Sequence, residues 1–110
     1  MILEKFNLNG KTAIVTGANR GIGQYYSMAL AEAGADIIGV SNETDFAETE
    51  KLIKPSGKNL STYVCDMSSR SSLYDLINKL NSDFTKIDIL VNNAGIIRIK
   101  LIYKIIKRLR

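Results

Sequence analysis

Cysteine and proline each occur only once in this chain of 110 residues. The lone Cys65 has no internal disulfide partner, which is typical of proteins in a reducing compartment. With a single proline, the composition also argues against a long disordered linker. No apolar run approaches the length of a membrane-spanning helix, and Glu4 and Lys5 bring charge to the place where a signal peptide needs an apolar stretch. These absences predict a soluble cytoplasmic domain without a membrane partner.

Acidic residues are missing from the last part of the chain. Residues 98–110 contain six Lys and Arg and no Asp or Glu, whereas residues 1–97 carry a net charge of −2. The net charge of +4 therefore does not predict that the body of the chain binds nucleic acid. A basic amphipathic helix for a membrane or a partner is one interpretation of the tail. We prefer a domain at residues 1–97 followed by an out-of-frame tail at 98–110.

Apolar segments of strand length alternate with segments of helical spacing. The pattern predicts strands at residues 11–16, 36–40, 60–65 and 87–91. It predicts helices from residue 22 to 33, over 44–54, and from about 73 to 84, the last capped by Ser68 or Ser69. Such alternation favours right-handed βαβ units. The predicted fold class is therefore α/β, a doubly wound parallel sheet in three layers that ends after its fourth strand.

Three glycines with the spacing G-x-x-x-G-x-G follow the first predicted strand. Gly17 permits a sharp turn, Gly21 lets the backbone approach a phosphate, and Gly23 lets the next helix pack close to the sheet. The start of that helix supplies N–H groups and a dipole that favours negative charge. An ordinary glycine-rich turn is the alternative. The strand before the loop and the helix after it favour a site for the pyrophosphate of a dinucleotide.

Three motifs, TGANRGIG at 16–23, CDM at 65–67 and IDILVNNAG at 87–95, together resemble the short-chain dehydrogenase/reductase family. The resemblance covers about residues 7–98 and implies a Rossmann-like fold. It implies hydride transfer between the nicotinamide of NAD or NADP and a carbonyl or alcohol carbon. The segments MILEKFNLNGKTAIVTG, GADIIGVSN and NNAGIIR are similar to the sugar-acid branch of the family, with its deoxygluconate and gluconate dehydrogenases. The implied substrate is a small sugar acid, and full-length relatives are homotetramers.

The resemblance also implies positions that contact the cofactor. The glycine loop would hold the pyrophosphate and adenosine ribose, Asp66 would accept a hydrogen bond from the adenine amino group, and Asn92 would brace the sheet. Two simpler interpretations remain open, because Asp66 could cap the following helix and the asparagines could satisfy backbone groups at a strand end. The predicted cofactor-binding residues are Gly17, Asn19, Arg20, Gly21, Ile22, Gly23, Ser41, Asn42, Asp66, Met67, Asn93, Ala94 and Gly95.

The choice between NAD and NADP remains open. An acid at the end of the second strand usually binds the ribose 2′-hydroxyl of NAD, but Ser41 and Asn42 stand there. Arg20 could pair with the 2′-phosphate of NADP, or it could be a solvated loop charge. The resemblance to the sugar-acid branch favours NAD.

We assign no catalytic residue and no metal ligand. In the family, a serine and a Tyr-x-x-x-Lys pair follow a further helix and strand beyond the NNAG segment. Tyr103 and Lys107 have the tyrosine–lysine spacing, but they follow Gly95 too closely and are interpreted as a coincidence. We expect the cofactor-binding half of an oxidoreductase, inactive alone. The alternatives are a non-catalytic nucleotide-binding module and a basic-tailed interaction fragment.

A stability expectation follows from the number of predicted strands. In the family, the strand at residues 87–92 lies inside the sheet, next to a fifth strand. Without a fifth strand, Ile87, Ile89, Leu90 and Val91 are expected on an open apolar edge, which favours aggregation.

Overall fold

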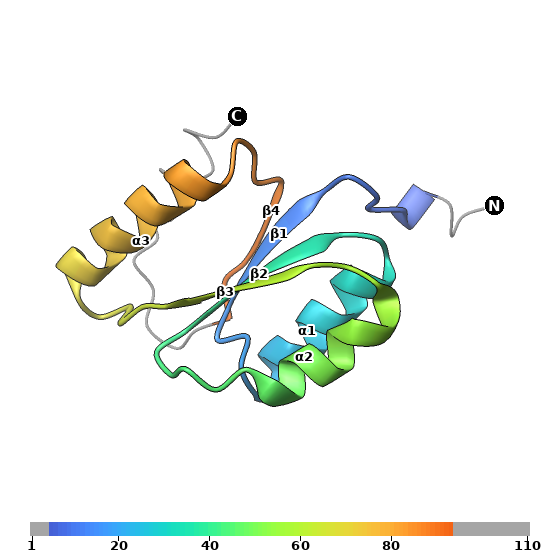
Figure 1. The fold of residues 1–110 in the computed structure, drawn as a ribbon, viewed down its shortest axis with the longest axis horizontal. Helices are drawn as coiled ribbons and strands as arrows, with labels where there is room; N and C mark the ends of the chain where they lie inside the picture. The colour runs from blue at the N-terminus through green and yellow to red at the C-terminus, as the bar shows by residue number, and fades with distance from the viewer. Residues whose placement is uncertain (1–4, 94–110) are drawn as a thin grey trace.

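A parallel β-sheet with helices on both faces forms the body of the molecule (Figure 1). The computed structural model describes residues 5–93. Strands and helices alternate along them, which confirms the predicted α/β class. The elements are β1 (Thr12–Thr16), α1 (Gly21–Glu32), β2 (Asp36–Ser41), α2 (Ala47–Ile53), the 3-10 turn η2 (Lys54–Ser56), β3 (Leu60–Val64), α3 (Arg70–Asp83) and β4 (Ile89–Val91).

The strands lie in the order β3-β2-β1-β4, and every neighbouring pair is parallel. The chain therefore begins at β1, moves outward through β2 and β3, and then crosses back to place β4 on the other side of β1. Ile14 of β1 is in register with Ile38 of β2 and with Leu90 of β4. Ligands of open α/β sheets bind where the direction of winding reverses, outside the carboxyl ends of the strands. Here that place is the end of β1 and β4.

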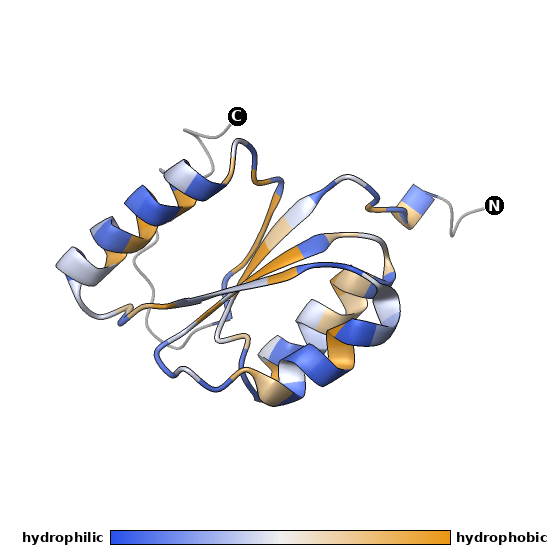
Figure 2. Cartoon of the chain, viewed as in Figure 1, coloured by the Kyte–Doolittle hydropathy of each residue, from blue (hydrophilic) through white to orange (hydrophobic). Residues whose placement is uncertain are grey.

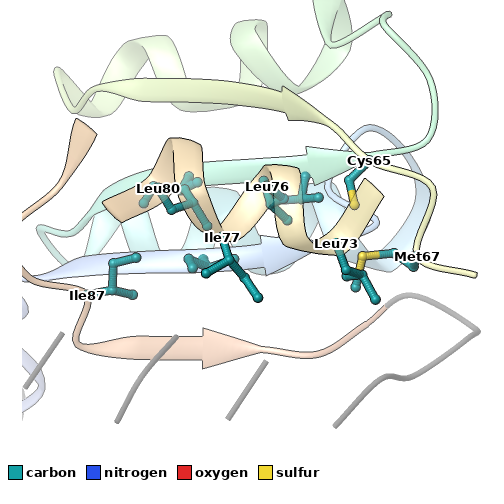
Figure 3. Packing of buried hydrophobic residues seen from close by; sticks show 10 residues of the cluster. Cys65, Met67, Leu73, Leu76, Ile77, Leu80 and Ile87 are labelled. Atoms are coloured by element: carbon teal, nitrogen blue, oxygen red, sulfur yellow. The ribbon is translucent and has the colours of Figure 1, made fainter. Parts of the chain in front are cut away.

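Alternate residues of β1 and β2 face two separate cores. Ala13, Val15 and Ile37 pack with α1 and α2, whereas Ile14 and Ile38 pack beneath α3. Burial on both faces is typical of parallel strands, which explains their nearly continuous apolar sequences. Figure 2 shows an apolar stripe along α3 on its sheet side, and Figure 3 shows the residues of this core. The labelled side chains are Cys65, Met67, Leu73, Leu76, Ile77, Leu80 and Ile87.

The predicted helix at 44–54 differs from the structure at both ends. It begins at Ala47, whose N–H donates to Asp45 Oδ1 at 3.0 Å, so Asp45 belongs to a turn before the helix. Pro55 does not end the helical segment, because it lies in the first turn of η2, where proline is tolerated. Gly57, with φ of 73°, ends η2 in a left-handed conformation.

The α3 cap is Ser69, whose Oγ accepts a hydrogen bond from the Ser72 N–H at 3.3 Å. One of the two predicted caps is therefore confirmed. The other, Ser68, has a different role described below.

Strand β4 is shorter than the predicted 87–91. Ile87 is only 2% exposed beneath α3, so the expectation that it lies on an open edge is wrong. Asp88 is bound to the start of β1 twice: its N–H donates to Thr12 O at 2.9 Å, and its Oδ2 accepts from the Thr12 N–H at 3.0 Å. A carboxylate takes the place of a backbone carbonyl there, and regular strand pairing begins at Ile89.

Candidate functional site

A cavity of about 370 Å³ opens at the carboxyl ends of the strands. Its wall is built by the β1–α1 loop, the end of β2, the β3–α3 connection and the second residue after β4. The size is at the lower end of the range of small-molecule sites. The lining residues are Gly17, Asn19, Arg20, Val40, Ser41, Asn42, Asp66, Met67, Ser68 and Asn93.

The glycine loop needs glycine at three positions for two different reasons. Gly17 and Gly21 have φ of 66° and 58°, in the left-handed region that favours glycine. Gly23 is required by space, since a Cβ there would stand 2.0 Å from the Gly17 carbonyl oxygen and 2.7 Å from Asn93 Nδ2. The close packing predicted for Gly23 is thus against the loop and the end of β4.

The first amides of the loop are used within the sheet. The N–H groups of Gly17 and Ala18 both donate to Val40 O, at 2.7 and 3.2 Å. These two amides are therefore not free to bind a ligand. At the N-terminus of α1, the N-cap residue Arg20 makes no side-chain capping hydrogen bond to the helix amides, and the first turn contains no acid. These features leave the amide end of α1 available to an anion.

A buried hydroxyl fixes the loop from the far side. Thr49 of α2 is fully buried, and its Oγ1 donates to Ala18 O at 2.7 Å. Ser27 of α1 donates in the same way to Gly23 O at 2.9 Å. No sequence pattern pointed to the Thr49 contact, because an isolated Thr on a helix carries no signal of its tertiary partner. The Ser27 bond is local, since its acceptor is the carbonyl four residues earlier in the same helix.

Asp66 forms a turn beside the cavity and does not cap α3. Its Oδ1 accepts hydrogen bonds from Ser68 Oγ at 2.6 Å and from the Ser68 N–H at 3.0 Å. These two bonds, the side-chain one first, lower the pKa of the Asp66 carboxyl. Its N–H donates to Ser72 Oγ at 2.9 Å, which ties the turn to α3. The helix-cap interpretation of Asp66 is therefore wrong, because Ser69 occupies that position.

The two asparagines that follow β4 connect it to the end of β1. Thr16 Oγ1 accepts from the Asn93 N–H at 2.9 Å and donates to Asn92 Oδ1 at 3.4 Å. Asn93 Nδ2 also donates to Gly17 O at 3.4 Å. Asn92 braces the sheet as predicted. Asn93 satisfies a backbone carbonyl at the strand end, as the simpler interpretation predicted, and it also lines the cavity, whereas its contact with a cofactor stays a prediction.

An ion pair joins the glycine loop to the segment that follows β2. Arg20 Nη2 lies 2.7 Å from Glu43 Oε1, and the Arg20 side chain is 74% exposed, so Arg20 is a solvated loop charge that has an acidic partner. The Ser41 side chain, 4% exposed, accepts a hydrogen bond from the Glu43 N–H at 3.0 Å. Glu43 was not among the predicted site residues, since it stands two positions beyond the usual place of the acid.

Most predicted site residues that the structure describes lie together around this cavity. Gly21, Ile22 and Gly23 do not line it; the Ile22 side chain is 64% exposed, and Gly23 supports the loop from behind. Val40 and Ser68 line the cavity although they were not predicted. Ala94, Gly95, Tyr103 and Lys107 lie outside the described residues.

Comparison with known proteins identifies the class. A family profile described as short chain dehydrogenase matches residues 11–108. A 2-dehydro-3-deoxy-D-gluconate 5-dehydrogenase of Pseudoalteromonas atlantica is 53% identical over 98 residues, which cover 87% of this chain and 39% of the relative. A protein of the same name from Dickeya dadantii is 47% identical over 98 residues, 89% of this chain and 38% of the relative. The chain thus spans less than half the length of these relatives.

Solved structures agree in fold. A short chain dehydrogenase from Mycobacterium paratuberculosis bound to NAD has a TM-score of 0.70 and 28% identity, covering 83% of this chain and 39% of its own. A metagenomic short-chain oxidoreductase in complex with NADP has a TM-score of 0.76 and 30% identity, covering 82% and 41%. The chain belongs to the short-chain dehydrogenase family, whose sheet is the Rossmann type and whose members bind NAD or NADP.

Its described helices include none with the length and apolar character needed to cross a membrane.

Proposed function

We propose that this chain binds the adenosine diphosphate part of NAD or NADP in the cavity at the ends of the strands. The observation that carries the proposal is the meeting of four elements there: the glycine loop, the end of β2, the Asp66 turn and Asn93. The glycine loop fits the dinucleotide, because it needs a residue without a side chain at Gly23. A Cβ there would collide with the Gly17 carbonyl in the loop that borders the cavity.

Each wall of the cavity has a separate task in this proposal. The amides of Asn19 and Arg20, which line the cavity just before α1, hold the pyrophosphate, and Arg20 makes no side-chain capping hydrogen bond there. Asp66, whose pKa is lowered by its hydrogen bonds from Ser68, accepts a hydrogen bond from the adenine amino group. Ser41 and Asn42 face the adenosine ribose.

The reaction is proposed from the relatives. When bound, the nicotinamide supplies or accepts a hydride, and the whole protein would act on an alcohol or ketone group of a sugar acid. Two relatives that carry the name 2-dehydro-3-deoxy-D-gluconate 5-dehydrogenase support this substrate class. We assign no catalytic group to residues 5–93, and we propose that the chain binds the cofactor without turnover when alone.

The binding proposal is tested by thermal unfolding with and without dinucleotide. At a concentration ten times its Kd, a ligand of the folded state stabilises it by about 1.4 kcal/mol, which raises the Tm of a domain of this size by roughly 5–10 °C. NAD and NADP are compared with nicotinamide mononucleotide, which lacks the adenosine part. An unchanged Tm with both dinucleotides contradicts the proposal.

The activity proposal needs a separate assay. The chain is mixed with NAD or NADP and 2-dehydro-3-deoxy-D-gluconate, and reduced nicotinamide is followed by absorbance. We expect binding without turnover. Formation of reduced cofactor would overturn the proposal of an inactive binding unit.

A further inference from the structure

The ion pair between Arg20 and Glu43 joins two segments that meet at the cavity. Arg20 belongs to the glycine loop and lines the cavity, whereas Glu43 follows β2. The separation of 2.7 Å between Arg20 Nη2 and Glu43 Oε1 is that of a charge-assisted hydrogen bond. The two side chains are 74% and 44% exposed, so the pair adds little to folding stability. The pair nevertheless alters the electrostatic surroundings of a charged ligand in the cavity.

Glu43 is held in position by the end of β2. The buried Ser41 Oγ accepts from the Glu43 N–H at 3.0 Å, which turns the chain back toward the glycine loop. Ser41 stands where an acid would bind a ribose 2′-hydroxyl, and its hydroxyl is used to place the acid two residues later. The negative charge of Glu43 therefore lies next to Arg20, which lines this end of the cavity.

The charged side chains near the proposed ribose position disfavour the 2′-phosphate of NADP. A 2′-phosphate carries nearly two negative charges and would need Arg20 as its partner. Glu43 already pairs with Arg20, and a second acid, Asp66, also lines the cavity. NADP must therefore either displace Glu43 or lie beside its carboxylate. NAD carries only a hydroxyl at this position and meets neither cost.

We propose that Glu43 is a specificity-determining residue that selects NAD over NADP by competing with the 2′-phosphate for Arg20. This inference rests on the proposed function, because it concerns the same cavity. It differs from direct recognition of the ribose hydroxyls by an acid at the end of β2, since Glu43 acts through Arg20.

The test is the ratio of the Kd for NADP to the Kd for NAD, measured by calorimetry on the whole chain. In Glu43→Gln, Arg20 is freed, and we expect the ratio to fall about five- to tenfold, mainly through tighter NADP binding. Glu48→Gln is the matched control: it removes the same charge from an exposed site on α2, paired with Lys51 at 3.5 Å. The control should change the ratio by less than about twofold.

Arg20→Gln distinguishes competition for Arg20 from simple repulsion. If Glu43 acts through Arg20, adding Glu43→Gln to Arg20→Gln should change the ratio much less than it does in the native chain. An equal change in both backgrounds, or the same ratio in Glu43→Gln and Glu48→Gln, overturns the inference and leaves the proposed function intact. Absence of binding by either dinucleotide in the native chain overturns both. Circular dichroism of each variant verifies that it is folded.

Discussion

At the scale of single residues, the three loop glycines have distinct physical roles. Gly17 and Gly21 supply backbone conformations, whereas Gly23 supplies empty space beside a carbonyl oxygen. A Cβ added at Gly23 would meet the backbone carbonyl of Gly17, which cannot rotate away as the end of a flexible side chain could. Gly23 is therefore the position where a single methyl group should affect the cavity most.

We expect Gly23→Ala to weaken NAD binding by more than about tenfold and to lower the free energy of unfolding by about 1–3 kcal/mol, as overpacking does. The matched control is Gly57→Ala, because Gly57 has φ of 73° but a Cβ there meets nothing within 4 Å among the described residues. The control should lose about 1–2 kcal/mol through backbone strain and retain normal binding. Calorimetry and urea unfolding measure the two effects. Normal NAD binding by Gly23→Ala would contradict the assigned role.

At the scale of elements, the parallel pair of β1 and β4 is held at its start by Asp88. Partial desolvation acts to raise the pKa of this carboxyl, but the Thr12 N–H and nearby Lys86 outweigh it and leave the pKa lowered. A lowered pKa in the folded state means that the unfolded state binds protons more readily. The stability due to the Asp88 carboxylate is therefore present above the unfolded-state pKa and is lost as the pH falls through the folded-state value.

For Asp88→Asn, we expect lower stability than the native chain at pH 7 and a difference that shrinks as the pH is lowered toward 3. The asparagine amide oxygen can still accept from Thr12, but it has no charge to pair with Lys86 and no proton to gain. Urea unfolding at pH 7, 5 and 3 measures the difference. Glu48→Gln, which removes an exposed charge, serves as control. A constant difference at all three pH values would show that the carboxylate charge is unimportant.

At the scale of the whole molecule, the strand order leaves β4 and β3 at the two edges of the described sheet. Ile89, Leu90 and Val91 are half-buried, and each packs against one of the two cores. On β3, Val64 is 53% exposed. β4 is an edge strand of the described sheet, as expected. The exposed edge is shorter than expected, because Ile87 is buried and Asp88 is bound to Thr12.

We expect the chain to be prone to aggregation through the β4 edge, because β4 is an edge strand of the described sheet and its half-buried apolar residues favour pairing with another copy. Light scattering over a hundredfold range of concentration, with thermal unfolding at each end, measures this. Val64→Lys places a charge on the opposite edge and should leave the association largely unchanged. A monomer at all concentrations that melts sharply and reversibly would contradict the expectation.

The local signals in the sequence were enough to predict the elements and the class of site. Alternating strand and helix patterns determined the parallel sheet, and the glycine spacing after β1 determined the loop that borders the cavity, because both depend on neighbouring residues. The pairing of Arg20 with Glu43, of Thr49 with Ala18 and of Asp88 with Thr12 was decided only by the tertiary structure. Each joins segments whose relative placement depends on turn geometry and on packing of the whole sheet, and no local pattern encodes it.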